Sequence, residues 1–167
     1  TLLDMAEDGD IDVEQREYLP GDLEGASLVF VATGDEEVNR QVAKEAKERG
    51  ILLNVVDVPN LCDFIVPAMV RRGDLCIAVS TGGASPRLAR RIRERLDEDF
   101  GAEYAAYVKL LGRHRDRITN SSLPSAEKAK VVDALLDSDI LEMIRDGNSA
   151  GAEKRADEIL TERLKDR

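Results

Sequence analysis

Two groups of residues between Asn54 and Arg93 could do chemistry, and each follows an apolar run of strand length. Asp57 ends the run Asn54-Val55-Val56, and the turn Thr81-Gly82-Gly83-Ala84-Ser85 follows the run Leu75 to Ser80. A carboxylate at the mouth of a cleft can act as a general base when it lies within hydrogen-bond reach of a substrate. Exposed amides at the start of a helix bind carboxylate or phosphate groups. Because ligand sites in open α/β sheets lie at strand ends, we expect neighbouring strands to bring the acid and the anion site together.

Both groups also allow a purely structural interpretation. Asp57 would equally cap the turn after its strand, and the glycine-rich stretch would equally form a tight turn before a helix that Ser85 caps and Pro86 begins. The arginines of that helix favour an anion site, and three of them could bind a multiply charged anion: Arg87, Arg90 and Arg91. Arg93 and Arg95 fit a solvated surface better.

The element that must position Asp57 is a strand–helix–strand unit. Its strands are the apolar runs 27–32 and 51–56, and Asp35 caps the intervening helix, which Gly50 ends. The short connections predict a βαβ unit and hence a parallel sheet.

Thr33 and Gly34 follow the first of these strands, in the same layer as Asp57. A small residue there would let the backbone approach a cofactor closely, or it would simply form the turn into the helix. A doubly wound nucleotide-binding sheet normally starts with a strand and a Gly-x-Gly-x-x-Gly turn. Gly82-Gly83 follows the wrong strand for that role. We therefore expect the first strand–helix–strand of the sheet, with its phosphate-binding loop, to precede Thr1.

The remaining elements are predicted from apolar spacing. Residues 13–19 could form an edge strand, residues 64–72 a short helix, and residues 75–80 a third strand of the sheet. In the basic helix that follows, four residues have the spacing of a buried stripe: Leu88, Ala89, Ile92 and Leu96. From residue 99 onward the pattern is helical throughout.

The composition limits the class of protein. With 167 residues, 43% of them hydrophobic, the chain suits one domain, or one domain with a helical extension. Its net charge of -10 disfavours general nucleic-acid binding. Charge is uneven, since residues 1–25 hold nine acids against Arg16, whereas residues 71–95 hold seven arginines. The chain carries neither a signal peptide nor an apolar run of about twenty residues, so we expect no membrane partner and a cytoplasmic location.

The cysteines and the histidine do not form a metal-binding pattern. Cys62 and Cys76 lack a Cys-x-x-Cys spacing and lie in mostly apolar surroundings, so we expect small buried thiols in a reducing compartment. A structural zinc ion normally needs four ligands. His114 lies among arginines and is expected at the surface.

Three segments together carry a family resemblance: VATGDEEVNRQV, ILLNVVDVPNLCDFIVPAMVRRGDL and IAVSTGGASPRLARRIRERL. Asn-Val-Val-Asp and Ser-Thr-Gly-Gly-Ala-Ser-Pro, in register, are more specific together than either motif alone. From about Ser27 to Leu96 the chain resembles the N-terminal module of siroheme synthase. That family comprises precorrin-2 dehydrogenases, some of which are also sirohydrochlorin ferrochelatases.

The resemblance implies an α/β fold in three parts. Residues 1–74 would be the remainder of a Rossmann-like NAD-binding domain with a parallel sheet, residues 75–99 a strand and basic helix of a dimerisation and tetrapyrrole region, and residues 100–167 a helical domain. It implies oxidation of precorrin-2 to sirohydrochlorin with NAD as cofactor. It also implies insertion of ferrous iron in bifunctional members, and a homodimer.

The resemblance further implies roles for individual residues. Asp57 matches the family's essential aspartate, proposed to remove protons in both dehydrogenation and chelation. Five residues match the family's strand ends that flank the nicotinamide side of the cofactor: Thr33, Gly34, Asn54, Val55 and Val56. Four residues match the family's loop beside the tetrapyrrole cleft: Thr81, Gly82, Gly83 and Ser85. Arg87, in the helix that follows, is added as a cation for the substrate. No permanent metal ligands are implied.

Two other classes of function use the same residues differently. A nucleotide-sensing domain, or a carrier that only binds a tetrapyrrole, would have a similar sheet and helical tail but would not need Asp57. An Asp57→Asn change separates these classes, because an enzyme would lose turnover while retaining ligand binding.

Overall fold

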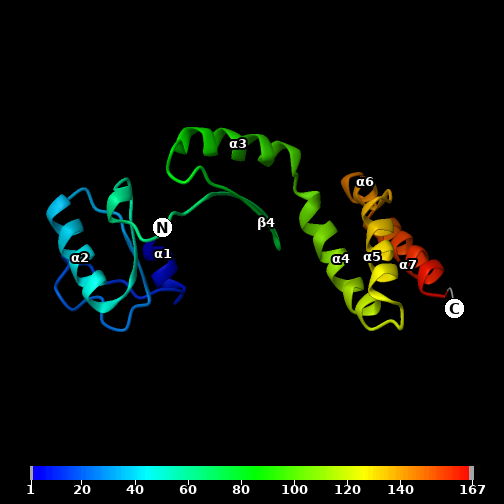
Figure 1. Cartoon of the computed structure of the whole chain (residues 1–167), viewed down its shortest axis with the longest axis horizontal. Coiled ribbons are helices and arrows are strands. Elements are labelled where there is room, and N and C mark those ends of the chain that lie inside the picture. Colours follow the sequence, from blue (N-terminus) through cyan, green and yellow to red (C-terminus); the bar gives the residue numbers. More distant parts are fainter. Residues whose placement is uncertain (1, 166–167) are drawn as a thin grey trace. The chain divides into compact units, whose positions relative to one another are not determined.

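The computed structural model describes residues 2–165, which divide into two compact units, residues 2–66 and residues 67–165 (Figure 1). The sequence-based boundary after residue 74 falls beside the turn of a hairpin in the second unit. The finer division into three parts stays a prediction. No described helix combines the length and apolar character needed to cross a membrane.

The first unit contains the expected βαβ motif. Strand β1 (Leu28–Val31) pairs in parallel with β2 (Leu52–Val55), and helix α2 (Glu36–Arg49) connects them. The Asp35 carboxylate accepts hydrogen bonds from the amides of Glu37 and Val38, which confirms it as the N-cap. Gly50 ends the helix at φ 70°, a left-handed conformation that costs glycine little.

One face of this strand pair packs on α2, and the other is only partly covered, by the ring of Phe64 against Phe30 with centroids 5.4 Å apart. The core of the unit consists of Leu23, Val31, Val42, Ala46, Ile51, Leu53 and Val55. On the opposite face Leu28, Phe30 and Leu52 are each about half exposed. Because parallel sheets are normally covered on both faces, this surface fits a sheet within a larger α/β domain.

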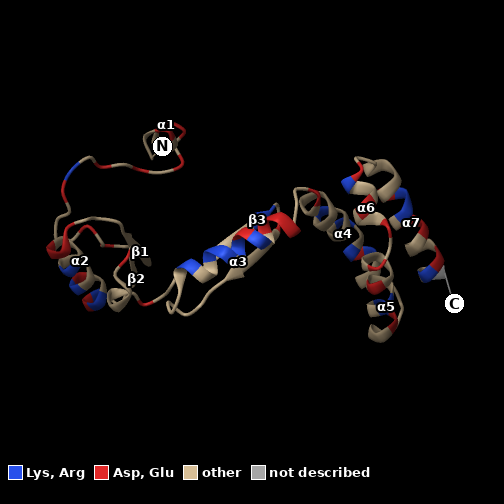
Figure 2. Cartoon of the chain, turned by 90° about the horizontal axis from the view of Figure 1, so that it is seen from above, with Lys and Arg blue, Asp and Glu red and all other residues tan. Residues whose placement is uncertain are grey.

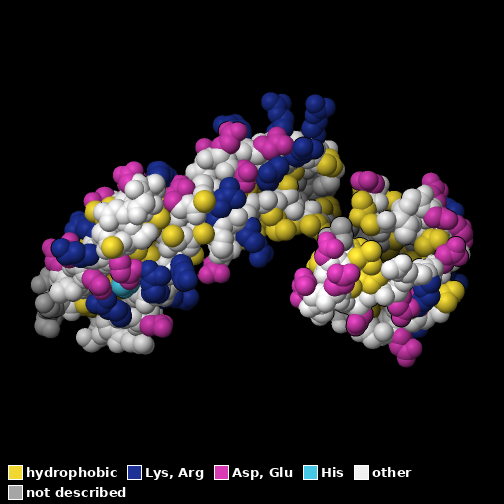
Figure 3. Space-filling view, turned by 180° about the vertical axis from the view of Figure 1, so that it is seen from behind, with side chains coloured by type: hydrophobic (Ala, Val, Ile, Leu, Met, Phe, Trp, Pro, Cys, Tyr) yellow, Lys and Arg dark blue, Asp and Glu magenta, His cyan; other side chains and the backbone are white. Residues whose placement is uncertain are grey.

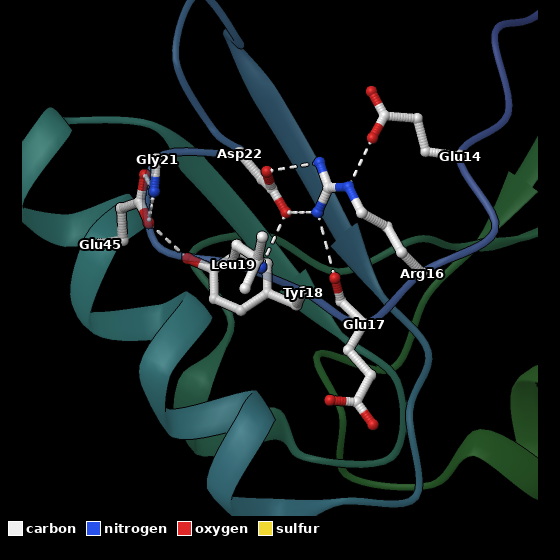
Figure 4. A network of polar contacts seen from close by, with 8 residues as sticks. All are labelled: Glu14, Arg16, Glu17, Tyr18, Leu19, Gly21, Asp22 and Glu45. Atoms are coloured by element: carbon white, nitrogen blue, oxygen red, sulfur yellow. Dashed lines mark hydrogen bonds and ion pairs between the residues drawn. The ribbon is translucent and has the colours of Figure 1, made fainter.

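Helix α1 (Leu2–Glu7) precedes a connecting segment, residues 13–25, which we call the strap. The predicted edge strand at 13–19 is wrong, because side chains rather than a strand ladder hold the strap in place (Figure 4). Arg16 forms two hydrogen bonds to the Asp22 carboxylate, at 2.7 and 2.8 Å. Glu45 of α2 accepts hydrogen bonds from the Tyr18 hydroxyl and, at 2.9 Å, from the Gly21 amide.

The second unit begins with an antiparallel hairpin of β3 (Ala68–Arg72) and β4 (Leu75–Val79). The predicted helix over residues 64–72 is therefore wrong. Arg72 pairs with Leu75, so Gly73 and Asp74 form a two-residue turn, and Gly73 has a φ of 58°. Glycine followed by aspartate at this spacing is a known hairpin signal, because such turns require positive φ.

Strand β4 also does not join the parallel sheet as expected. Each of the two sheets has two strands, β1 with β2 and β3 with β4. The outer edge of β2 is occupied by the loop that follows it, because the Asp63 amide donates to the Leu53 carbonyl at 2.8 Å and the Leu53 amide donates to the Asp63 carboxylate at 2.9 Å. A covered edge of this kind cannot accept a further strand.

Helix α3 (Pro86–Asp99) packs on the hairpin, and its N-cap is Ser85, as predicted. The expected buried stripe is only partly formed, since Ala89 is buried but Leu88 and Ile92 are 50% and 38% exposed. Apolar spacing along a helix predicts a face but not the partner that covers it.

Four helices complete the second unit: α4 (Glu103–Thr119), α5 (Ser125–Leu136), α6 (Ile140–Arg145) and α7 (Ser149–Lys165). Their core includes Leu110, Leu135, Ile140 and Leu160. His114 of α4 is 4% exposed, so its expected surface position is wrong. Its Nε2 atom lies 3.0 Å from a Glu153 oxygen on α7, close enough for an ion pair although not aligned as a hydrogen bond.

Candidate active site at the ends of β1 and β2

Asp57 follows β2 in an unusual backbone conformation. It is exposed and has a φ of 61°, the one described non-glycine residue with positive φ. The Val58 amide donates to the Val55 carbonyl at 3.2 Å, which closes a turn around Asp57. Aspartate tolerates the left-handed region better than most residues, but the conformation persists only where neighbouring contacts hold it. The turn thus directs the carboxylate into open space at the carboxyl end of the strand.

A short loop folds back and fastens this turn to the edge of β2. The Cys62 sulfur lies 3.2 Å from both the amide nitrogen and the carbonyl oxygen of Val55, and 3.4 Å from the Val58 carbonyl oxygen. The side-chain amide of Asn54 donates to the Phe64 carbonyl at 2.9 Å. The sequence favours a packed thiol at Cys62 over a metal contact beside Asp57, and nothing in its spacing signals these contacts.

Thr33 and Gly34 lie at the matching end of β1. The Thr33 hydroxyl donates to the side-chain oxygen of the buried Asn39 at 2.6 Å and accepts from the Asp35 amide at 3.2 Å. Gly34 faces open space, since a Cβ atom placed there would meet no other atom within 4 Å. Asn39 was not singled out from the sequence, although a polar residue on the buried face of a predicted helix is a usable signal.

Parallel pairing brings these residues to one edge. Phe30 is opposite Asn54 and Val31 is opposite Val55, and the Val56 amide donates to the Val31 carbonyl at 2.9 Å. The carboxyl ends of the two strands are therefore side by side, as ligand sites of open α/β sheets require.

The five cofactor candidates differ in what they can offer a ligand. Thr33, Gly34 and Val56 are exposed, but the Thr33 hydroxyl is already bonded to Asn39, so a planar group could lie against Gly34 and Val56. Val55 is only 2% exposed and contributes packing, and the Asn54 side chain is already bonded to the loop. The edge fits the close backbone approach of a flat cofactor, with Asn54 and Val55 shaping the site from behind.

The glycine-rich candidate lies in the second unit, between β4 and α3. The Thr81 hydroxyl accepts from the Ser85 amide at 3.1 Å, and the Ser85 hydroxyl accepts from the Leu88 amide at 3.3 Å. Gly82 and Gly83 have φ values of 59° and 83°, which explains two consecutive glycines. Two hydroxyls thus set the shape of the helix start and leave Gly82 and Gly83 exposed.

Helix α3, which follows this loop, is rich in arginine, and these positions are the blue segments of α3 in Figure 2. A shallow hollow of about 650 Å³ is lined by Pro86, Arg87, Arg90, Arg91 and Glu94. Arg90 pairs with Glu94 at 2.9 Å, which leaves Arg87 and Arg91 as the better cations for a ligand. On the face seen in Figure 3, arginine side chains lie next to apolar ones over α3 and the hairpin.

The sequence-predicted residues therefore form two groups. Asp57 and the cofactor candidates share one edge of the parallel strand pair, whereas Thr81 to Ser85 and Arg87 belong to the other unit. The expectation that the acid and the anion site follow neighbouring strands is wrong, because β4 pairs with β3. Cys76 on β4 is exposed, against the expectation of a buried thiol. In the described part of the chain, no three His, Cys, Asp or Glu residues cluster as metal ligands would.

Two family models match different parts of this chain. Residues 2–68 match a family model described as NAD(P)-binding, so the first unit belongs to a nucleotide-binding class with a Rossmann-like fold. Residues 72–98 match a second family model, described as the central part of a sirohaem biosynthesis protein. The chain thus matches, in order, two parts of the siroheme synthase pattern, which confirms the resemblance drawn from its motifs.

Individual relatives agree with this assignment. The chain is 38% identical over 164 residues to a siroheme synthase of Pseudomonas paraeruginosa, covering 98% of this chain and 34% of that protein. A siroheme synthase of Methylococcus capsulatus is 34% identical over 92% of this chain and 32% of its own length. The chain thus spans about a third of the length of these relatives. A solved structure of SirC, a precorrin-2 dehydrogenase, matches with a TM-score of 0.70 and 25% identity over 96% of this chain and 76% of that one.

Proposed function

We propose that this chain takes part in the NAD-dependent oxidation of precorrin-2 to sirohydrochlorin, a step of siroheme biosynthesis. The observation that carries the proposal is the exposed Asp57 carboxylate, held in a left-handed turn beside the ends of two parallel strands. The siroheme synthase and precorrin-2 dehydrogenase relatives supply the substrate.

The reaction removes two hydrogens from precorrin-2, one as hydride and one as a proton. NAD⁺, when bound, supplies the hydride acceptor. Asp57 takes the proton, since a carboxylate in hydrogen-bond reach of the reacting carbon is a sufficient general base. A small number of converging groups is enough, because this chemistry needs orientation more than a covalent intermediate.

The cofactor side of the site uses the edge shared by β1 and β2. Gly34 and Val56 offer an open surface to the nicotinamide, and Thr33 holds the β1 turn through Asn39. Asn54 and Val55 set the end of β2 behind it. We therefore assign all five candidates to the cofactor side, but only Gly34 and Val56 to direct contact.

The substrate side uses the start of α3. Precorrin-2 carries eight carboxylates, and the backbone of Gly82 and Gly83 with the cation of Arg87 would bind some of them. Thr81 and Ser85 keep this loop in shape. A local basic surface explains how a chain of net charge -10 accepts a polyanion.

A second copy of the chain is the partner we propose for the hairpin and α3. The outer face of the hairpin exposes Met69, Cys76 and Ala78, and α3 exposes Leu88 and Ile92. A two-stranded hairpin is marginally stable by itself, so burial of this face in a homodimer would stabilise it. Ferrous iron would be a substrate in a bifunctional protein, and insertion would require Asp57 to remove pyrrole protons.

The test is anaerobic NADH formation from precorrin-2 and NAD⁺ by the complete gene product and its Asp57→Asn variant. We expect turnover from the first and a loss of at least about 100-fold in the second, with precorrin-2 binding retained. No turnover from the unmodified protein would reject the dehydrogenase and leave a sensor or a carrier. Equal turnover in both would keep the enzyme and reject Asp57 as the base. Added ferrous or cobaltous ion, compared with the uncatalysed rate, tests chelation.

A further inference from the structure

We propose that Cys62 is a positioning residue, whose thiol holds Asp57 in its productive conformation. The inference rests on the proposed dehydrogenase function and adds to it a second residue on which the reaction depends. It comes from the contacts of one side chain with the turn that presents the carboxylate.

The outer edge of β2 is the starting point. Leu53 and Val55 direct their backbone groups away from β1, toward the position of a missing neighbouring strand. Asp63 satisfies both groups of Leu53, through its amide and its carboxylate. Cys62 lies beside Val55 in the same way, with its sulfur 3.2 Å from the amide nitrogen and 3.2 Å from the carbonyl oxygen.

The sulfur also reaches the far side of the turn. It lies 3.4 Å from the Val58 carbonyl oxygen, so one thiol contacts the residues immediately before and after Val56 and Asp57. The thiol accepts from the Val55 amide and donates to one carbonyl at a time. It therefore ties together the two ends of the four-residue turn that the bond from Val58 to Val55 closes.

Asp57 needs such support because its conformation is not the preferred one. A left-handed backbone costs a non-glycine residue about 1–2 kcal/mol, so a free turn would relax toward negative φ. Relaxation would change the direction in which the Asp57 side chain leaves the backbone. A misplacement of about 1 Å lowers the rate of a positioned reaction by about 100-fold. Loss of the thiol would thus reduce the rate without removing any group that touches substrate.

The experiment measures steady-state NADH formation by the complete gene product. Cys62→Ala removes the hydrogen bonds, and Cys62→Ser keeps a donor and an acceptor at the same position. Ser122→Ala is the control, since it removes an exposed hydroxyl group from the loop between α4 and α5, in the other unit and outside the proposed dimer contact. Asp57→Asn and the double variant Asp57→Asn with Cys62→Ala complete a double-mutant cycle.

We expect Cys62→Ala to lower kcat about tenfold with less than about a twofold change in the KM for NAD⁺. Cys62→Ser should recover most of that loss, and Ser122→Ala should match the unmodified protein. In the Asp57→Asn background, Cys62→Ala should add nothing, because its effect passes through the carboxylate. An unchanged kcat in Cys62→Ala, or losses that simply multiply in the double variant, would overturn the proposal.

Failure of the proposed function would look different. An unmodified protein that forms no NADH rejects the dehydrogenase, whatever the cysteine does. Amide hydrogen exchange at Val58 then tests whether the Cys62 thiol holds the turn around Asp57, because the Val58 amide bonds across that turn. Faster exchange in Cys62→Ala than in Cys62→Ser supports the thiol as the tie, and equal exchange in both overturns it.

Discussion

At position 57 the backbone and the carboxylate can be tested separately. Asp57→Gly should leave the free energy of unfolding unchanged or raise it by up to about 1 kcal/mol, because glycine adopts a φ of 61° without strain. Asp57→Val should lower it by about 1–2 kcal/mol. Both should abolish turnover. Urea unfolding measures the stability of both variants, and NADH formation measures their turnover. An Asp57→Gly variant that retains turnover would contradict the role of the carboxylate.

A second residue-scale prediction concerns His114, which contacts Glu153 and is packed among the helices of the second unit. His114→Ala should lower the free energy of unfolding by about 2 kcal/mol, because it leaves a cavity and removes the partner of a carboxylate. Arg115→Ala, on the exposed side of the same helix, should change it by less than about 0.5 kcal/mol. Thermal unfolding of both variants tests this prediction. Equal stability of His114→Ala and Arg115→Ala would show that the buried contact contributes nothing.

At the scale of elements, the hairpin depends on its turn. Gly73 has positive φ, and a Cβ atom there would lie 3.3 Å from the Cβ atom of Ala105 on α4. Gly73→Ala should therefore lower the free energy of unfolding by about 1–2 kcal/mol. Gly112→Ala is the opposite control, because Gly112 lies inside α4 with open space around it and alanine should stabilise that helix by about 0.5–1 kcal/mol. Chemical denaturation should therefore show a lower free energy of unfolding for Gly73→Ala and a higher one for Gly112→Ala.

The strap is expected to loosen in acid. Hydrogen bonds from the Tyr18 hydroxyl and the Gly21 amide hold the pKa of Glu45 below its usual range, and the Arg16 guanidinium lowers the pKa of Asp22 to about 2. Because both carboxyl groups have lower pKa values when folded, their stabilisation is complete above about pH 4.5 and is lost as the pH falls toward 2. The Gly21 amide shift in NMR should follow this loss.

Substitution of Glu45 provides the control for the strap. Glu45→Gln should remove the part of the Gly21 shift that follows Glu45, since the amide oxygen does not titrate, and should leave only the change caused by the neighbouring Asp22 carboxyl group. Glu48→Gln on the exposed face of the same helix should leave the titration unchanged. A Gly21 shift that stays constant in the unmodified protein would refute the carboxylate's role in holding the strap.

At the scale of the whole molecule, the exposed apolar residues of α3 mark the proposed contact between two copies. A double change of Leu88 and Ile92 to Glu should shift the protein from dimer to monomer in sedimentation experiments, because it places charges on a buried surface. Leu136→Glu on α5 is the matched control, since Leu136 is 49% exposed and lies outside this surface. A dimer that survives the double change would place the interface elsewhere.

Local sequence signals were enough for much of the fold and for half of the site. Caps at Asp35 and Ser85, the stop at Gly50 and the two apolar runs defined the βαβ unit and α3. The position of Asp57 at the end of a strand followed from the same pattern. These features depend on residues within a few positions of one another, so the chain itself specifies them. The hairpin turn at Gly73 was also present in the sequence as a local signal, although the spacing of its neighbours suggested a helix.

Tertiary structure decided which elements meet and which side chains are covered. Whether β4 pairs with β2 or with β3 depends on the edge that Cys62 and Asp63 occupy, which no spacing reveals. The burial of His114 and the exposure of Leu88 likewise depend on helices far away in sequence. Local periodicity fixes the direction in which a side chain points from its element. Only the packed structure supplies the atoms that it meets there, and these atoms determine how Asp57 is held.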